Sequence, residues 1–142
     1  MTTNAKAYGK VEHWQRMLRK SPALVRAASK ALAEATLELI DEGFVAEADP
    51  YGKRWAPKAR PDGRKVLTGK TRRLRRRWRA VRVDKSGFHV IPGVDYAAAH
   101  QAPRYGRRPR RMMVPDSRRG LPARWRKRFK QVAGSQFKKY LR

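Results

Sequence analysis

The chain has no cysteine, no long apolar run and few acidic side chains. The absence of cysteine excludes a disulfide scaffold, an iron–sulfur cluster, a cysteine-based zinc site and a cysteine nucleophile. Since no stretch of about 18 apolar residues occurs, no transmembrane helix is expected. Residues 1–10 are polar and lack the apolar core of a secretory signal. We therefore expect a soluble, intracellularly made protein, and 142 residues suit a single domain covering residues 1–142.

Acidic residues are especially scarce in the second part of the chain. Lys and Arg number 37 against 11 Asp and Glu, which gives a formal net charge of +26. Residues 1–50 hold seven basic and seven acidic side chains, so residues 51–142 carry the whole excess. This asymmetry indicates a polyanionic partner for the second part. Nucleic acid is the first candidate, an acidic protein surface the second and an anionic membrane the third.

The scarcity of carboxylates also argues against catalysis. The four acidic residues that follow Tyr51 are isolated from one another, so neither paired-carboxylate chemistry nor a magnesium nuclease is supported. Three histidines, His13, His89 and His100, lack the spacing of metal ligands. Gly69-Lys70-Thr71 resembles the end of a phosphate-binding loop, but Arg64 stands where that loop requires glycine. The sequence therefore predicts no enzyme, no catalytic residue, no metal and no cofactor.

Apolar periodicity predicts helices near both ends of the chain. A first helical piece covers residues 10–19, and Ser21-Pro22 is the start signal of a long helix that runs to about residue 48. A last helix from residue 121 carries an apolar stripe on an otherwise basic surface. The stripe consists of Leu121, Trp125, Phe129, Val132 or Ala133, Phe137 and Leu141.

The region between the helices is predicted to hold short elements and loops. In chain order we expect a turn at 49–52, an extended loop at 53–66, a short helix within 69–76, strands at 78–83 and 88–91 joined by a tight turn, a helical turn at 95–101, an extended loop at 102–111 and a third strand at 112–114. The predicted fold class is α+β. A long N-terminal helix and a C-terminal helix pack on a small antiparallel β-sheet, with extended Arg- and Pro-rich loops.

Basic residues gather in three clusters. Residues 70–79 hold seven Lys or Arg, residues 104–111 hold five Arg, and residues 118–130 hold seven Lys or Arg. Seven like charges within ten residues repel one another unless a counter-charge lies nearby, so the first cluster favours a polyanion partner over a merely solvated surface. Aromatic residues are sparse among the clusters, which favours contact with a phosphate backbone over base stacking.

Four segments in a fixed order carry a resemblance. They are Asp49-Pro50-Tyr51-Gly52 with Trp55 and Pro57, Leu67-Thr68-Gly69 with Leu74, Val94-Asp95-Tyr96-Ala97-Ala98-Ala99-His100-Gln101, and Arg107 to Asp116 with Pro109-Arg110-Arg111-Met112. The order and spacing over residues 49–116 resemble the tailed-phage virion morphogenesis proteins, the family of tail-completion and neck proteins. Ala102-Pro103-Arg104 departs from the family, which has a glycine-containing segment there, and the C-terminal helix is richer in arginine.

The resemblance implies a structural protein that joins tail to head as a closed ring around the DNA channel. It would be made in the host cytoplasm and located in the virion neck or tail. A hexamer is the natural expectation, with a dodecamer possible. The implied partners are further copies of the chain, neighbouring neck, portal-side and tail tube or terminator proteins with acidic surfaces, and double-stranded DNA that passes through without sequence recognition.

Two sets of residues are candidates for these contacts. The expected DNA-facing residues are Arg72, Arg73, Arg75, Arg76 and Arg77. The expected subunit or partner contacts are Trp55, Tyr96, His100, Gln101, Arg107, Arg108, Arg110 and Arg111. For the aromatic and polar members, packing within the chain is an equal alternative. We expect the loops at 53–66 and 102–111 to reach the next subunit. The second function left open is a stand-alone, nonspecific nucleic-acid-binding protein.

Overall fold

The computed structural model describes residues 12–13, 15–16, 18–103 and 109–140. Its elements in chain order are α2 (Pro22–Ala46), α3 (Arg73–Arg76), β1 (Arg79–Asp84), β2 (Gly87–Ile91), α4 (Ala97–Gln101) and α5 (Ala123–Tyr140). The described residues between 12 and 20 are helical as well, whereas residues 10, 11, 14 and 17 of the predicted first helix lie outside the described set. The predicted α+β class, with a helix at each end and a small antiparallel sheet, is confirmed.

Helix α2 begins and ends where its capping groups lie. The Ser21 hydroxyl accepts a hydrogen bond from the Leu24 N–H (3.3 Å), and Pro22 occupies the first turn, where it loses no bond. Glu47 adopts a left-handed conformation and ends the helix, slightly before the predicted end near residue 48. Its carboxylate then accepts from the Val66 N–H (2.7 Å), so the helix end also holds the following loop.

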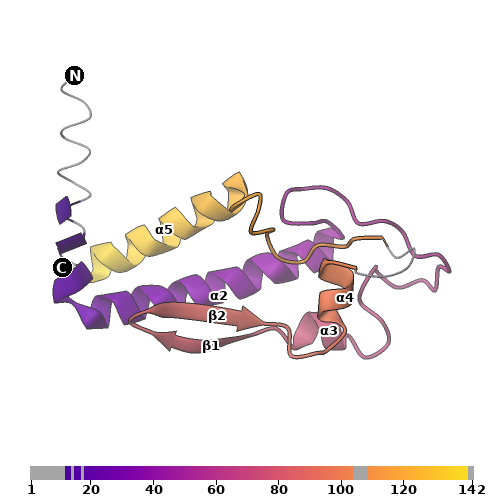
Figure 1. Cartoon of the computed structure of the whole chain (residues 1–142), viewed down its shortest axis with the longest axis horizontal. Coiled ribbons are helices and arrows are strands. Elements are labelled where there is room, and N and C mark those ends of the chain that lie inside the picture. The colour runs from indigo at the N-terminus through magenta and orange to yellow at the C-terminus, as the bar shows by residue number, and fades with distance from the viewer. Residues whose placement is uncertain (1–11, 14, 17, 104–108, 141–142) are drawn as a thin grey trace, which may run out of the picture.

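Helix α2 lies between α5 and the β-hairpin (Figure 1). Helix α5 runs antiparallel to α2, and the Ser21 hydroxyl donates to the Tyr140 hydroxyl (2.5 Å), which joins the start of α2 to the end of α5. Two interhelical ion pairs connect the acidic side of α2 to the basic side of α5. They are Glu38–Arg128 (2.7 Å) and Glu42–Arg124 (3.4 Å).

The hairpin forms where alternating apolar residues flank a turn. Strands β1 and β2 pair antiparallel, with Arg79 opposite Ile91 and Val81 opposite His89. The register shifts between Val81 and Asp84, where Arg82 takes a left-handed conformation and makes an irregularity in β1. The predicted hairpin is therefore confirmed, with boundaries shifted by about one residue.

The third strand predicted at residues 112–114 does not form. Instead the Gln101 side chain binds this backbone: its Oε1 accepts from the N–H of Met113 (2.7 Å) and Val114 (3.2 Å), and its Nε2 donates to the Val114 carbonyl (2.9 Å). A single amide side chain thus supplies the partners that a neighbouring strand would supply. Met112 and Met113 are buried, so their apolar character reflects burial of a loop rather than a strand.

The core lies at the C-terminal end of α2, where the loops fold back. Phe44 is fully buried there, and its ring meets the Trp55 ring edge-on, with centroids 5.4 Å apart. The same cluster includes Leu74 from α3, the loop residue Met113, and Trp125 from α5. Most of the loops thus converge on one end of the molecule, beside α3 and α4 (Figure 1).

Candidate polyanion interface

The four segments that carry the family resemblance pack on one another. Trp55 is 7% exposed, and its indole N–H donates to the Met112 carbonyl (2.9 Å). The Arg111 guanidinium donates to the carbonyls of Ala56 and Pro57 (2.9 Å each), so the last segment also holds the first. Trp55, Gln101 and Arg111, three of the predicted contact residues, therefore bind within their own chain.

The turn at residues 49–52 forms as predicted, with Asp49 as its organiser. The Asp49 carboxylate accepts from the N–H groups of Tyr51 and Lys53 (2.9 Å each), an arrangement that replaces missing backbone partners in a turn. The Tyr51 hydroxyl accepts from the Asp116 N–H (3.1 Å) and donates to the Gly120 carbonyl (2.5 Å). This turn is thus fixed to the segment that leads into α5.

The other predicted contact residues are exposed, half-buried in the case of His100, or outside the described residues. Tyr96 is 46% exposed, and its ring meets the His100 ring edge-on with centroids 6.3 Å apart. Arg110 is exposed and donates to Asp116 Oδ2 (3.1 Å) and to the Gln101 carbonyl (2.9 Å). Arg107 and Arg108 lie outside the described residues, as does the whole of residues 104–108 in the predicted loop at 102–111. Tyr96 and Arg110 therefore offer surface to a partner.

Of the five predicted DNA-facing arginines, Arg76 and Arg77 are exposed, and the other three line two adjoining hollows. Arg75 forms a two-pronged ion pair with Asp41 of α2 (2.6 and 3.1 Å), and this hydrogen bond lowers the pKa of Asp41 and raises the pKa of Arg75. Arg72 lies on the same side of the 67–72 turn as Arg75, whereas Arg73 lines a separate hollow. Arg72 and Arg75 therefore line one hollow and Arg73 lines the adjoining one.

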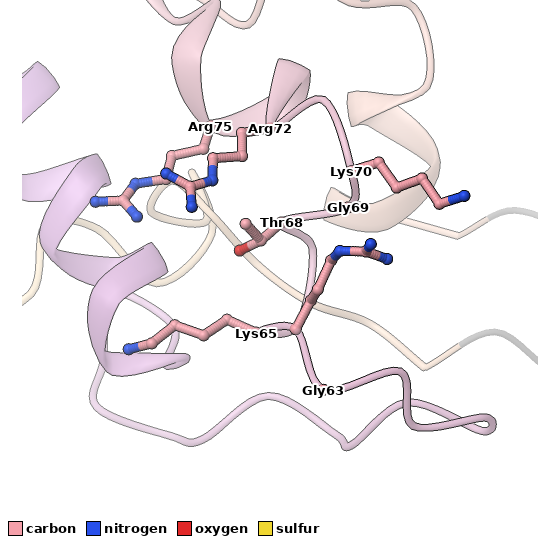
Figure 2. Close-up of a pocket in the computed structure, with 8 residues that line it drawn as sticks. Gly63, Lys65, Thr68, Gly69, Lys70, Arg72 and Arg75 are labelled. Atoms are coloured by element: carbon pink, nitrogen blue, oxygen red, sulfur yellow. The ribbon is translucent and has the colours of Figure 1, made fainter.

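Arg72 and Arg75 line a basic hollow of about 380 Å³ together with residues from the preceding loop (Figure 2). Five cations line it: Arg64, Lys65, Lys70, Arg72 and Arg75. Its described lining contains no acidic residue, and the Thr68 side chain lies between the arginines of one wall and Lys65 of the other (Figure 2). Arg64 and Lys65 were in no predicted cluster, since they belong to the loop at 53–66 and meet the arginines only through folding.

The backbone between residues 63 and 72 shapes this basic hollow. Gly63, Leu67, Gly69 and Arg72 all have positive φ, between 53° and 78°, so the chain reverses direction repeatedly over ten residues. The Thr68 N–H donates to the Lys65 carbonyl (3.2 Å), which closes one of these turns. Because the chain reverses repeatedly, side chains that an extended chain would spread apart lie around the rim of the basic hollow.

A second depression, the aromatic hollow, lies on the other side of the Thr68-Gly69 turn. Its volume is about 300 Å³, and it shares Thr68 and Gly69 with the basic hollow. The exposed Tyr96 and the basic side chains of Arg73 and Lys58 line it. Cationic surface therefore continues from the basic hollow past the turn to an aromatic ring.

The sequence also raised a phosphate-binding loop, a metal site and a membrane-spanning helix. Gly69-Lys70-Thr71 follows a loop rather than a strand, which is the element that a phosphate-binding loop requires. Within the described ranges, no group of three or more His, Asp and Glu is placed to hold a metal ion. None of the described helices is long and apolar enough to span a bilayer.

No family model matches the chain, and no curated protein or solved structure matches it either.

Proposed function

We propose that the chain is a structural protein of a tailed-phage virion. It forms a closed ring in the neck or tail-completion region and joins tail to head around the DNA channel. The observation that supports this proposal is that the four resembling segments pack together. Three are joined by hydrogen bonds, and Leu74 of the other lies in the same core cluster as Trp55 and Met113. Residues spread over 49–116 contact one another through Trp55–Met112, Arg111–Pro57 and Gln101–Met113, as a motif set that specifies one fold would.

Each of these motif residues has a structural role in the same part of the fold. Asp49 organises a turn, Trp55 fills the core beside Phe44, and Gln101 replaces a strand for residues 113–114. The Asp49 and Gln101 contacts are half-buried hydrogen bonds, and their polar groups are costly to leave without a partner. This set of contacts within one chain supports the inference that the chain adopts the fold of the family it resembles.

The charge of such a ring exceeds what enclosed DNA can neutralise. Six copies at +26 each carry 156 positive charges. Duplex DNA carries about one charge per 1.7 Å, so roughly 40 Å of it offers about 24 negative charges. The acidic residues of the chain are already subtracted in this net charge, so the ion pairs within the subunit do not reduce it. Most of the remaining arginines in the proposed ring face acidic surfaces of neighbouring virion proteins.

Ring closure requires a head-to-tail contact between two different surfaces of the subunit. The half-exposed Tyr96 and the exposed Arg110 lie near the end of the molecule where the loops gather, and they are the described candidates for one of these surfaces. The loops at 53–66 and 102–111 remain the proposed arms toward the next subunit. Comparing protease cleavage of these loops in the free protein and in the assembled particle tests that part of the proposal.

The mass of the purified protein in solution tests the ring itself. We expect native mass spectrometry to show a hexamer or dodecamer, either in the free protein or after addition of tail tube and portal-side proteins. Electron microscopy of the same sample should show closed rings with a central channel. A protein that stays monomeric with those partners, and instead coats duplex DNA at regular density, contradicts the proposal.

A stand-alone, nonspecific nucleic-acid-binding protein is the second candidate function. The observation that favours it is the basic hollow, which is complete within one subunit and needs no neighbour to form. This second function does not explain why the four resembling segments occur in their fixed order, since general DNA binding does not require them. The mass measurement above separates the two functions.

A further inference from the structure

We propose that the basic hollow is a phosphate-binding site that takes the phosphodiester backbone of a nucleic acid. The inference concerns one subunit and does not need the ring, so it can hold or fail independently of the proposed function. It also differs from a contact made by the whole arginine run at 72–77, because the structure places Arg73 in the other hollow. The site combines the loop residues Arg64 and Lys65 with Lys70, Arg72 and Arg75.

Three of the five cations are held at the rim by bonds to their own chain. Arg75 is paired with Asp41, Arg64 donates its N–H (3.0 Å) and a guanidinium N–H (3.3 Å) to Asp62, and the Lys65 ammonium donates to the Val45 carbonyl (2.5 Å). Asp41 and Asp62 do not line the hollow. The bonds therefore restrict these side chains while leaving positive charge on the walls, and a preorganised site loses less side-chain entropy on binding.

Besides Lys65, whose partner is a neutral carbonyl, Lys70 and Arg72 supply the cations that are not neutralised. Both are exposed, and within the described part of the chain neither forms an ion pair. The left-handed conformation of Arg72 (φ 53°) at the start of α3 directs its side chain toward the wall that Arg75 occupies (Figure 2). Guanidinium groups bind phosphate through paired N–H donors, so this wall suits a tetrahedral oxyanion.

The volume of the hollow fits a hydrated phosphate. About 380 Å³ corresponds to the liquid volume of about a dozen water molecules. One phosphate group with its bridging waters occupies part of this space, and the remainder lets the sugar backbone enter and leave.

The aromatic hollow favours a nucleic acid over an acidic peptide as the source of the anion. It adjoins the basic hollow at Thr68 and Gly69 and adds Arg73 and the half-exposed ring of Tyr96. A backbone that repeats phosphate and sugar can place a second phosphate near Arg73 and an apolar sugar face on Tyr96. A run of carboxylates has no comparable use for an aromatic ring between two basic patches.

The experiment compares DNA binding by three full-length proteins over a range of salt. The test variant is Lys70→Gln with Arg72→Gln, and the control is Lys138→Gln with Lys139→Gln in the last turn of α5, which has the same change in charge. Fluorescence anisotropy with a labelled duplex gives the slope of log K against log salt. Each lost phosphate contact reduces the magnitude of this slope by about 0.9, so we expect a reduction of about 1.8 in the test variant and a much smaller one in the control.

Two results overturn the proposal: a slope in the test variant equal to that of the wild type, or an equal reduction in both variants. Both test side chains are exposed, so unchanged thermal unfolding by circular dichroism confirms that the variant is folded. A folded test variant with an unchanged slope therefore contradicts the site and not the stability of the protein.

Competitors identify the source of the anion. Amide signals of Thr68 and Gly69 should shift on adding the duplex in the wild type and should shift much less in the test variant. Inorganic phosphate that shifts these signals while the duplex does not assigns the site to a free phosphate and overturns the backbone assignment. Oligoglutamate that displaces the duplex from the wild type at equal charge concentration, and loses this ability in the test variant, assigns the site to acidic protein and likewise overturns it.

Discussion

Replacement of Gln101 tests whether this motif residue acts inside its own chain. In Gln101→Leu the side chain keeps a similar size but loses all three hydrogen bonds to residues 113 and 114. Two backbone N–H groups and one carbonyl then lack their partners in a half-buried segment. A buried polar group without a partner costs about 1–3 kcal/mol, and partial access of water reduces this. We expect the free energy of unfolding to fall by about 2–3 kcal/mol.

Urea unfolding followed by tryptophan fluorescence measures this loss. For 142 residues the entropy of unfolding is about 0.3 kcal/mol per kelvin, so the melting temperature should fall by about 7–10 °C. The matched control is Gln131→Leu at an exposed position of α5, which should change stability by less than about 0.5 kcal/mol. A Gln101→Leu protein as stable as this control, but unable to form the proposed ring, refutes the intrachain reasoning and assigns Gln101 to a subunit contact.

Three further changes probe a glycine, the interhelical ion pairs and the aspartates. Gly93→Ala should lower the free energy of unfolding by at least about 2 kcal/mol, because φ is +64° and the new Cβ would lie 2.7 Å from the Arg77 carbonyl oxygen. The control Gly52→Ala, also at positive φ but in open space, should lower it by about 1 kcal/mol. Equal losses in urea unfolding contradict the steric argument. Arg128→Gln should lower stability by less than about 1 kcal/mol at low salt, and the difference should vanish near 1 M NaCl; a difference that persists there excludes a screened ion pair. Hydrogen bonds from basic side chains or backbone N–H groups lower the pKa of three aspartates: Asp41, Asp62 and Asp116. Because their folded-state pKa values lie below the ordinary 3.8, their contribution to stability is complete above that pH and is lost as pH falls, down to about pH 2 for Asp62. The urea midpoint of the wild type should therefore fall as pH is lowered through this window, and that of Asp41→Asn should fall less.

Sequence patterns predicted well those elements whose signals are local. Ser21 and Pro22 mark the start of α2 through capping and a fixed φ, and both act within one turn of the chain. The hairpin follows from alternation around a turn, which is again a local signal. The third strand at 112–114 failed because Met112 and Met113 are apolar for burial, and their backbone partner is a side chain more than ten residues away. A short apolar run does not by itself distinguish a strand from a buried loop.

The candidate site shows the same division. Composition located the positive charge in residues 51–142 and singled out the run at 70–79, since charge is a property of the residues themselves. The sequence could not show that Arg75 forms an ion pair with Asp41, or that Arg73 lines a different hollow from Arg72. It also could not join Arg64 and Lys65 to that run. These pairings depend on contacts across the chain.

The sequence by itself thus determined the α+β class, the long helix, the hairpin and an excess of positive charge confined to one part of the chain. Tertiary structure decided which cations lie together and which motif residues are already engaged. The physical reason is that capping, periodicity and net charge act over a few residues. The basic hollow, by contrast, exists only because repeated positive-φ turns between residues 63 and 72 fold the loop against α3 and α2.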